Sequence, residues 1–588
     1  MAKEVRIYGI AASPGIAIGR AFVYRKQTPL VEKRQVTDTR IEIDKFMGGL
    51  ERAKSELIEI KRQIAERLGE SEASLWDAQV LLLDDPSAIE ATAARIRDQR
   101  QDAASAFQET MEQMIRSMEA TPNQYLKERA ADVRDLAWRV IKHLQYQATA
   151  IPLNIPRQAV VISHDLSPAD ITQLLDRKAA GFVTEAGGAT SHTAIVARSL
   201  ELPAVVGLKG ALLGVSQDDM AIVDGIRGAV IFNPGEKTTN AYRRELRNYA
   251  RRQDELKRLR KQKPVTRDGH GVELSANIEL SEEMPSVKSH GAMGVGLFRT
   301  EFIYLTSNQM PSENEQSQIY RRVAEQCRPD PVIIRTFDLG GDKIGEDYQE
   351  ANPFLGWRAV RYCLDRPDIF KIQLRAILRA SAHGNVRIML PMICCPDEVR
   401  RSKELLEICK RELADKGVAF DPSVKLGIMV ETPAAALMAN ELARLVDFFS
   451  IGSNDLTQYT LAVDRTNEKV ARMYEPFHPA VLRLIRDVIE AGHRAGIWVG
   501  LCGEMGADPL AVPLLLGLGI DELSVNPAAV PEVKKIIIGL RFDQCRKAAA
   551  AAMEMSDAAD VRAKLKDFLC QAMPGIKLID DSCALEIG

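Results

Sequence analysis

Two stretches of this chain, LGIMVET at residues 426–432 and DFFSIGSND at residues 447–455, share one pattern. Each is a short apolar run that ends in polar or charged side chains, as buried strands do when functional groups lie at their carboxyl ends. Beyond Pro264 the sequence has six further runs with helical patterns between them: VELSAN, VGLFRTE, VIIRTFD, VRIMLPM, IWVGLCGE and DELSVN. All of them except VRIMLPM end in polar residues. This order predicts a (β/α)₈ TIM barrel whose chemistry gathers at the carboxyl ends of the strands.

The residues before the barrel fall into two textures. From about Asp38 to Gln147, charged and apolar residues alternate at helical spacing with almost no strand signal, which predicts a helical bundle. Residues 1–25 predict two short strands that form a hairpin around the turn Ala12-Ser13-Pro14-Gly15. After Ile151, short apolar runs split by turns predict an α/β domain that the first strands would complete. We therefore interpret the bundle as an insertion into one α/β domain.

A chain of 588 residues is expected to form two to four domains. The stretch EKTTNAYRRELRNYARRQDELKRLRKQKP is polar on nearly every face, which is typical of an exposed connecting helix. The expected segments are 1–36 and 149–234 for the two parts of the α/β domain, 37–148 for the bundle, 235–263 for the linker helix, and 264–588 for the barrel with a C-terminal tail.

Composition excludes several classes of protein. Hydrophobic residues make up 46% and charged residues 27% of the chain, which is ordinary for a globular protein, and the net charge of -3 gives no support for nucleic-acid binding. The nine cysteines are scattered, which fits a reducing cytoplasm. We expect neither export nor insertion into a membrane, because no run approaches the ~18 apolar residues that a spanning helix needs.

Charged side chains at the predicted barrel mouth point to an anionic substrate and a cation. Glu431 and Asp455 close successive strands and could converge on Mg²⁺, which prefers carboxylate and substrate oxygens. Any one arginine beside a carboxylate fits a salt bridge equally well. Several arginines at one rim favour a phosphate-bearing ligand, because guanidinium matches phosphate and carboxylate oxygens. The candidates are Arg299, Arg335, Arg358 and Arg465.

Three further residues are candidates for chemistry. Cys502 ends a strand within GLCGEMG and is either a buried inert thiol or, since an ordinary thiol is protonated at neutral pH, a proton donor. Lys343 follows a glycine pair that could cradle phosphate, although such a pair is a weak signal. His192, in TEAGGATSHTAIVARSL, lies where a helix begins and would be favourably placed for phosphorylation, although a capping or packing role is also open.

Taken together, the motifs resemble enzyme I of the phosphoenolpyruvate-dependent phosphotransferase system over practically the whole chain. In the family's order they are GIAASPGIAIG, ERAADVRDLAWRV, GGATSHTAIVARSLELPAVVG, GLFRTEFIYL, IRTFDLGGDK, NPFLGWRAVR, GIMVETPAA, FFSIGSNDLTQYTLAVDR, HPAVLRLI and GLCGEMGAD. The resemblance implies a phosphohistidine α/β domain, an inserted carrier-binding bundle, and a phosphoenolpyruvate-binding barrel through which two copies form a homodimer.

The resemblance also implies a role for each candidate residue. His192 would take the phosphoryl group of phosphoenolpyruvate and pass it to a histidine-containing phosphocarrier protein, while Cys502 would protonate the enolate to give pyruvate. Glu431 and Asp455 would hold Mg²⁺. The substrate-binding residues would be Arg299, Arg335, Arg358 and Lys343 at the phosphate, and Asn454 and Arg465 at the carboxylate.

This sequence departs from the family near His192 and at the expected carrier-binding segment. Ala189 stands where an arginine is common, and Ile171 stands where a threonine is common. In WDAQVLLLDDP the resemblance implies carrier contacts, although an apolar triplet in a bundle is more often core. Gln79 replaces a frequent histidine there. The implied carrier-binding residues are Leu81, Leu82, Asp84 and Asp85.

Two other classes of function compete with this interpretation. A pyruvate phosphate dikinase or phosphoenolpyruvate synthase would need a large nucleotide-binding domain, and the helical segment has no glycine-rich phosphate loop. A non-catalytic sensor would not need the set of His192, Glu431, Asp455, Cys502 and the rim arginines. The sequence leaves open whether the carrier serves sugar uptake, which we favour, or a nitrogen-regulatory branch.

Overall fold

The computed structural model resolves two compact units, residues 1–253 and residues 254–588. It describes residues 4–24, 31, 33–68, 83–120, 124–145, 155–166, 170–171, 174, 177–188, 194, 197, 202–210, 212, 215–301, 303–304, 310–340, 350, 352–465, 467 and 469–574. No helix within these ranges is both long and apolar enough to pass through a bilayer.

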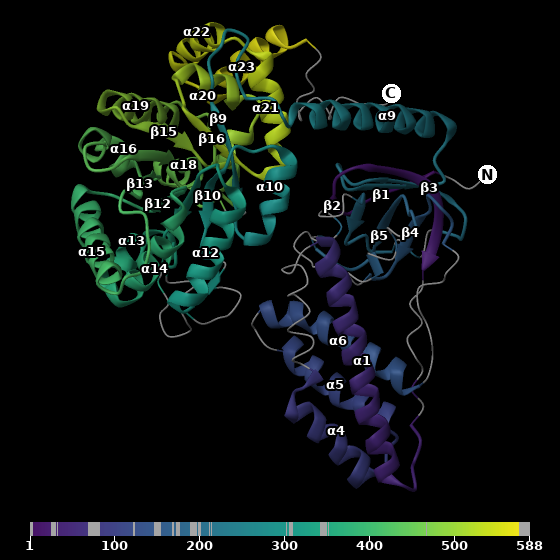
Figure 1. Ribbon diagram of the computed structural model, residues 1–588. Coiled ribbons are helices and arrows are strands. Elements are labelled where there is room, and N and C mark those ends of the chain that lie inside the picture. Colours follow the sequence, from purple (N-terminus) through teal and green to yellow (C-terminus); the bar gives the residue numbers. More distant parts are fainter. Residues whose placement is uncertain are drawn as a thin grey trace. The chain divides into compact units, whose positions relative to one another are not determined.

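The first unit contains a sheet, drawn in purple and blue in Figure 1. Its eight strands lie in the order β1-β8-β7-β3-β4-β5-β6-β2. Its strands are β1 (Val5–Tyr8), β2 (Ile10–Ser13), β3 (Ile16–Tyr24), β4 (Val160–Ser163), β5 (Gly181–Thr184), β6 (Ala204–Val206), β7 (Met220–Asp224) and β8 (Ala229–Phe232). β3 pairs in parallel with β4, although the whole helical bundle separates the two strands in sequence. The prediction that the bundle is inserted into an α/β domain is therefore confirmed.

The predicted N-terminal hairpin is wrong. Three strands form there instead of two, and none of them pairs with another: β1 pairs with β8, β2 with β6, and β3 with β7 and β4. The chain turns between β2 and β3 at Gly15, whose φ of 133° favours glycine. A hairpin would bury little apolar surface, whereas these long-range pairings bury Ala12, Ile16 and Ala17 to 6% exposure or less.

The inserted segment forms a bundle of helices. These are α1 (Thr39–Leu68), α4 (Pro86–Gln99), α5 (Ala103–Ala120) and α6 (Gln124–Leu144). Their apolar faces meet in one core, in which the rings of Phe46 and Phe107 lie 5.6 Å apart. The helical spacing read from the sequence therefore corresponds to buried faces of real helices.

A polar helix, α9 (Glu236–Leu259), follows the sheet. In the first unit, Tyr242 on this helix donates a hydrogen bond to Asp224 at 3.2 Å, and Glu245 pairs with Arg227 at 2.9 Å. In the second unit, Leu256 is buried and Glu255 pairs with Lys535 at 3.0 Å. The division between the units falls inside the helix, between residues 253 and 254.

The second unit is a closed barrel of eight parallel strands, β9 to β16, which confirms the predicted fold (Figure 1). The strands are β9 (Glu273–Ile278), β10 (Val295–Arg299), β11 (Val332–Arg335), β12 (Val386–Leu390), β13 (Lys425–Val430), β14 (Phe448–Ile451), β15 (Trp498–Leu501) and β16 (Glu522–Val525). Each of the eight apolar runs read from the sequence overlaps one strand.

Helices cover the outside of the barrel. They are α10 (Met284–His290), α12 (Glu313–Cys327), α13 (Val360–Asp365), α14 (Pro367–Ala380), α15 (Pro396–Asp415), α16 (Pro433–Leu437), α17 (Ala439–Leu442), α18 (Ser453–Leu461), α19 (Pro479–Ala495), α20 (Ala511–Leu518), α21 (Val530–Gly539), α22 (Phe542–Met553) and α23 (Ala558–Ala572). Short 3₁₀ turns lie between several of them.

The barrel interior has its own small apolar cluster below the strand ends. It consists of Leu297, Ile333, Met389, Met429, Phe448 and Cys502, with Trp498 packed against it. The ring of Phe448 stacks on Trp498 with 4.7 Å between centroids and lies over Gly427, where a side chain would collide with it. This cluster fills the inside of the barrel next to the functional residues at the carboxyl ends of the strands.

Replacing Phe448 by alanine should destabilise the barrel by about 3–5 kcal/mol, because the ring is fully buried and would leave a cavity. Urea unfolding followed by tryptophan fluorescence measures the loss. The same change at Leu437, which is 74% exposed, should alter stability by less than about 0.5 kcal/mol. Equal effects at the two positions would contradict this account of the core.

Candidate active site at the carboxyl ends of the barrel strands

Glu431 follows the last residue of β13 and is completely buried. Its Oε1 accepts a 2.6 Å hydrogen bond from the main-chain N–H of Met392, whose φ of 56° is unusual for a residue other than glycine. Its Oε2 is buried and accepts no hydrogen bond from any residue that the structure describes. Burial, and next repulsion from Asp455, raise the pKa of the Glu431 carboxyl well above its usual value, while Arg335 opposes the rise.

A network of arginines and carboxylates lies beside Glu431. Arg335, the last residue of β11, contacts Glu301 at 3.1 Å and Asp338 at 3.5 Å. Arg358 forms a two-pronged contact with Asp338, at 2.9 Å from Nε and 2.6 Å from Nη2. All four residues are less than 10% exposed. The carboxylates therefore hold both guanidinium groups in fixed positions before any ligand arrives.

Of the remaining predicted substrate-binding residues that the structure describes, Arg299 and Arg465 lie nearer the solvent, whereas Asn454 is buried. Arg299, the last residue of β10, pairs with Glu279 at 2.8 Å. Arg465 pairs with Glu504 at 3.2 Å, and the amide of Asn454 contacts the same carboxylate at 3.1 Å. Asn454 lies in the first turn of α18, next to Asp455. Each of the four predicted rim arginines therefore contacts a carboxylate, as a salt-bridge role would also require.

Cys502 lies one residue beyond β15 and is 2% exposed. Its Sγ lies 3.7 Å from the carbonyl oxygen of Ile451. Burial raises the pKa of the Cys502 thiol to about 11, and the charges of Glu431, Arg335 and Arg299 act on it more weakly. The thiol therefore carries its proton at neutral pH and lies within electrostatic reach of Glu431, Arg335 and Arg299.

The arrangement at Glu431 and Asp455 fits a divalent cation. Among the described residues no group of three or more His, Cys, Asp or Glu side chains is arranged to hold a metal ion, so a cation here would take its other ligands from substrate and water. Two observations favour a bound cation. The buried Oε2 of Glu431 has no hydrogen-bond partner among the described residues, and Asp455 repels the Glu431 carboxylate. A cation between the two carboxylates would remove both penalties.

Several predicted residues lie outside the described residues. These are His192, Lys343, Leu81, Leu82, and the family departures Ala189 and Gln79. Ile171, the other departure, is described and is buried in the core of the α/β domain.

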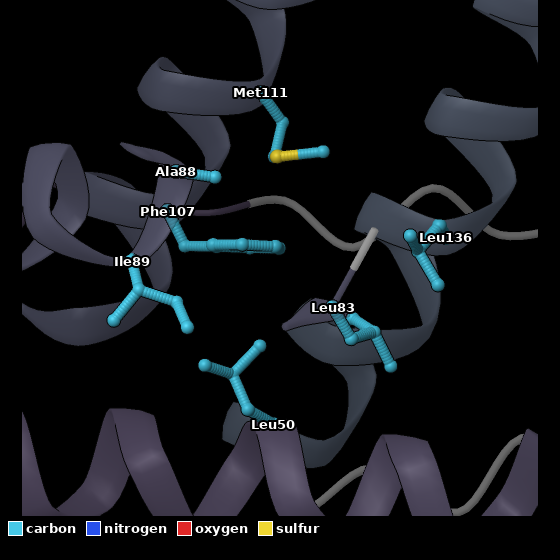
Figure 2. A pocket seen from close by; sticks show the side chains of 7 residues that line it. All are labelled: Leu50, Leu83, Ala88, Ile89, Phe107, Met111 and Leu136. Atoms are coloured by element: carbon cyan, nitrogen blue, oxygen red, sulfur yellow. The ribbon is translucent and has the colours of Figure 1, made fainter. Parts of the chain in front are cut away.

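The described part of the predicted carrier-binding segment has structural roles. Asp85 caps α4 by accepting a hydrogen bond from the N–H of Ser87 at 2.9 Å, and Asp84 pairs with Lys54 at 2.7 Å. Leu83 is buried beside a small apolar cavity in the bundle core (Figure 2). The third leucine of the triplet is therefore a core residue, and both aspartates retain exposed surface.

Sequence reasoning left out some residues that shape the site. Glu301, Asp338 and Glu504 were visible as strand-end acids, but nothing in their spacing shows which arginine each one contacts. Tyr459, whose hydroxyl lies 3.4 Å from Arg358, and Met392, which holds Glu431, carry no signal in the sequence. Tyr459 lies on α18, and the contribution of Met392 depends on the conformation of the loop after β12.

Replacing Glu431 by glutamine should stabilise the cation-free protein at pH 8 by about 1–3 kcal/mol. The folded pKa of Glu431 lies above the unfolded value, so folding favours the protonated carboxyl, and this favourable contribution is lost as the pH rises toward the folded pKa. Differential scanning calorimetry should show Mg²⁺ raising the Tm of the wild type more at pH 8 than at pH 6, and having no effect on the variant. Glu441→Gln, at an exposed position on α17, is the matched control. A lower Tm for Glu431→Gln would contradict the account.

Comparisons with known proteins identify the family of this chain. Three family models match the chain: the PEP-utilising enzyme PEP-binding domain at residues 253–542, the N-terminal domain at 8–129, and the mobile domain at 155–228. Phosphoenolpyruvate-protein phosphotransferases from Bacillus sp. (strain S) and Staphylococcus carnosus (strain TM300) are 44% and 42% identical over 564 residues, which is 95% of this chain and 97% and 98% of theirs. An NMR structure described as Enzyme I (nEIt) is 39% identical, covers 42% of this chain and 99% of that one, and has a TM-score of 0.36. At such identity over nearly the whole of both chains, the protein is an enzyme that belongs to the phosphoenolpyruvate-protein phosphotransferase family, the enzyme I family that its motifs resemble.

Proposed function

We propose that this enzyme transfers the phosphoryl group of phosphoenolpyruvate to its own His192 and then to a histidine-containing phosphocarrier protein, and releases pyruvate, as the first step of a sugar phosphotransferase system. Family membership supports the reaction. The observation that carries the choice of site is the buried network of Arg335, Arg358 and Asp338 beside the unpartnered carboxylate oxygen of Glu431. Such a site is suited to a substrate that brings both phosphate oxygens and a cation.

In this proposal the substrate phosphate binds Arg335 and Arg358, which Glu301 and Asp338 hold in place. Arg299 and Lys343 contribute further positive charge at the phosphate. Asn454 and Arg465 bind the substrate carboxylate, which would replace their contacts with the side chain of Glu504, 78% exposed. Binding therefore replaces the exposed carboxylate of Glu504 by the carboxylate of the substrate, while the contacts of the buried arginines remain.

Enzymes of this family need a divalent cation, and we infer that it is Mg²⁺ held by Glu431 and Asp455. When bound, the cation neutralises negative charge on the oxygens of the phosphate and of the departing enolate. Glu431 supplies a fixed oxygen because the N–H of Met392 orients its other oxygen. Asp455 approaches from the first turn of α18, beyond Gly452, where a side chain would lie within 3.0 Å of Glu431.

The transfer step breaks the bond between phosphorus and the enolate oxygen and forms a bond between phosphorus and an imidazole nitrogen of His192. The arginines hold the phosphate in line with the imidazole, which is the main task of catalysis in phosphoryl transfer. The thiol of Cys502 then gives its proton to the enolate carbon, and pyruvate forms. The raised pKa of the thiol keeps the proton available until then, and water returns it afterwards.

The partners and assembly belong to the same proposal. Leu81, Leu82, Asp84 and Asp85 would contact the carrier, in which case Asp84 and Asp85 would combine this contact with their roles in the bundle. Two copies would associate through their barrels. A carrier of the nitrogen-regulatory branch is the alternative acceptor. Cytoplasmic location stays a prediction from the cysteine pattern.

Incubation with ³²P-labelled phosphoenolpyruvate and Mg²⁺ should place acid-labile label on His192. His192→Ala should abolish the label and leave binding of phosphoenolpyruvate at the barrel intact, as measured by calorimetry. His164→Ala is the matched control, because His164 is exposed in the same domain and its ring pairs with Glu185. Transfer of the label to a sugar-branch or nitrogen-branch carrier identifies the acceptor. A protein that binds phosphoenolpyruvate but stays unlabelled would be a sensor and not an enzyme.

Replacing Cys502 by alanine should slow pyruvate formation by about 10²-fold or more, the usual range for loss of a general acid, while label still reaches His192. Rapid-quench kinetics that follow label and pyruvate in the same samples separate the two steps. A control, Cys570→Ala, removes an exposed thiol on α23 and should change neither rate. Full-rate pyruvate formation by Cys502→Ala would show that another group donates the proton.

A further inference from the structure

Cys502 occupies an unusual position in the hydrogen-bond ladder of the barrel. Its main-chain N–H still pairs with β14, donating to the carbonyl of Ile451 at 3.1 Å. On the other side, the pairing of β15 with β16 has already ended at Leu501 and Leu523. The carbonyl oxygen of Cys502 instead accepts a 2.9 Å hydrogen bond from the side-chain amide of Asn277. A side chain thus replaces the missing strand partner.

Asn277 reaches Cys502 from two strands away, because β16 lies between β9 and β15 in the barrel. Ser524 on β16 fixes the amide: its hydroxyl donates to Oδ1 of Asn277 at 2.6 Å, which leaves Nδ2 directed at Cys502. Ser524 is 1% exposed. Three polar groups on three adjacent strands therefore form one continuous chain on the inner face of the barrel.

The loop after Cys502 is held from the opposite side as well. Asn454 on α18 accepts a 2.9 Å hydrogen bond from the N–H of Glu504. Between these two fixed points lies Gly503, where any side chain would collide with Ser453. Glycine permits rotation of the 502–503 peptide, so the hydrogen bond from Asn277 to its carbonyl oxygen helps to set the orientation of this peptide, while Asn454 holds the next one.

From this arrangement we infer that Asn277 is a positioning residue for proton transfer: it fixes the main chain of Cys502, and Ser524 fixes Asn277. Loss of the amide donor would leave a buried carbonyl oxygen without a partner, which the peptide relieves by rotating about Gly503 and carrying the thiol away from the enolate carbon. The inference rests on the proposed role of Cys502 as proton donor.

Asn277→Asp tests the inference most directly. Aspartate keeps the oxygen that accepts from Ser524 but removes the donor to Cys502 and faces its carbonyl with a like partial charge. Pyruvate formation should fall about tenfold or more, while the rate at which label reaches His192 and the KM for phosphoenolpyruvate change by less than about twofold. Ser524→Ala should give a smaller loss of the same kind. Rapid-quench kinetics with full-length enzyme and Mg²⁺ measure all of these quantities.

The matched control is Asn526→Asp, at the end of the neighbouring strand. Its side chain is exposed and accepts a hydrogen bond from the N–H of Ala528, which aspartate can also do, so all rates should stay at the wild-type level. The control separates the effect of a new charge at the barrel mouth from the loss of the donor.

A double variant separates positioning from a general structural effect. In a Cys502→Ala background, Asn277→Asp should slow pyruvate formation by less than about twofold further, because no thiol remains to be positioned. An undiminished effect in that background, or equal rates of label and pyruvate in Asn277→Asp alone, would overturn the inference. If Asn277→Asp lowers the Tm sharply, Ser524→Ala and its own double variant decide. Full-rate pyruvate formation by Cys502→Ala would instead refute the proton-donor role itself.

Discussion

The buried charges at the mouth of the barrel are the constraint on which the site depends. Arg335 and Arg358 have been taken out of water, and so have Glu301, Asp338 and Glu431. An ion in such surroundings is tolerated only with a counter-ion and hydrogen bonds. The two arginines and their two partner carboxylates balance each other. Glu431 is the fifth buried charge. Its Oε2 has no hydrogen-bond partner among the described residues, so a bound cation would stabilise it.

This imbalance links stability to ligand binding. The ligand-free protein holds a carboxyl group at an energetic disadvantage, and a cation that arrives with a phosphate removes it. The fixed arginines also lower the entropic cost of binding, because their side chains are already oriented when the substrate binds. A site built in this way sacrifices some folding free energy in exchange for affinity and precise placement of the phosphate.

Much of this architecture could be predicted from the sequence, because strands and helices leave periodic patterns. The eight barrel runs, the bundle and the polar linker helix were visible as patterns of apolar residues. The hairpin expected at residues 1–25 was wrong because a local pattern does not reveal which distant strands a segment will meet. β2 and β3 each pair with strands that lie well over a hundred residues further along the chain.

The residues of the candidate site could be predicted about as well as the fold. Polar residues at strand ends indicated which side chains gather at the mouth, and the family resemblance supplied roles that geometry alone would not. The pairing of particular arginines with particular acids depends on loop backbones such as those at Ala359 and Met392. Both residues have positive φ, and neither is glycine, so the residue types do not predict these backbone conformations. The hydrogen bond from Asn277 to Cys502 is equally invisible, since it joins residues 225 positions apart.

The sheet of the first unit also has a consequence for biosynthesis. β3 emerges from the ribosome early, yet its neighbours β4 and β7 begin only at Val160 and Met220, after the entire bundle. The core contacts of the bundle lie within its own segment, so the bundle can fold while the N-terminal strands are still unpaired. During translation these strands carry unpaired edges for roughly two hundred residues, at the pace of ~5–20 residues per second. Nascent chains that stall in this interval would expose those edges to neighbouring chains.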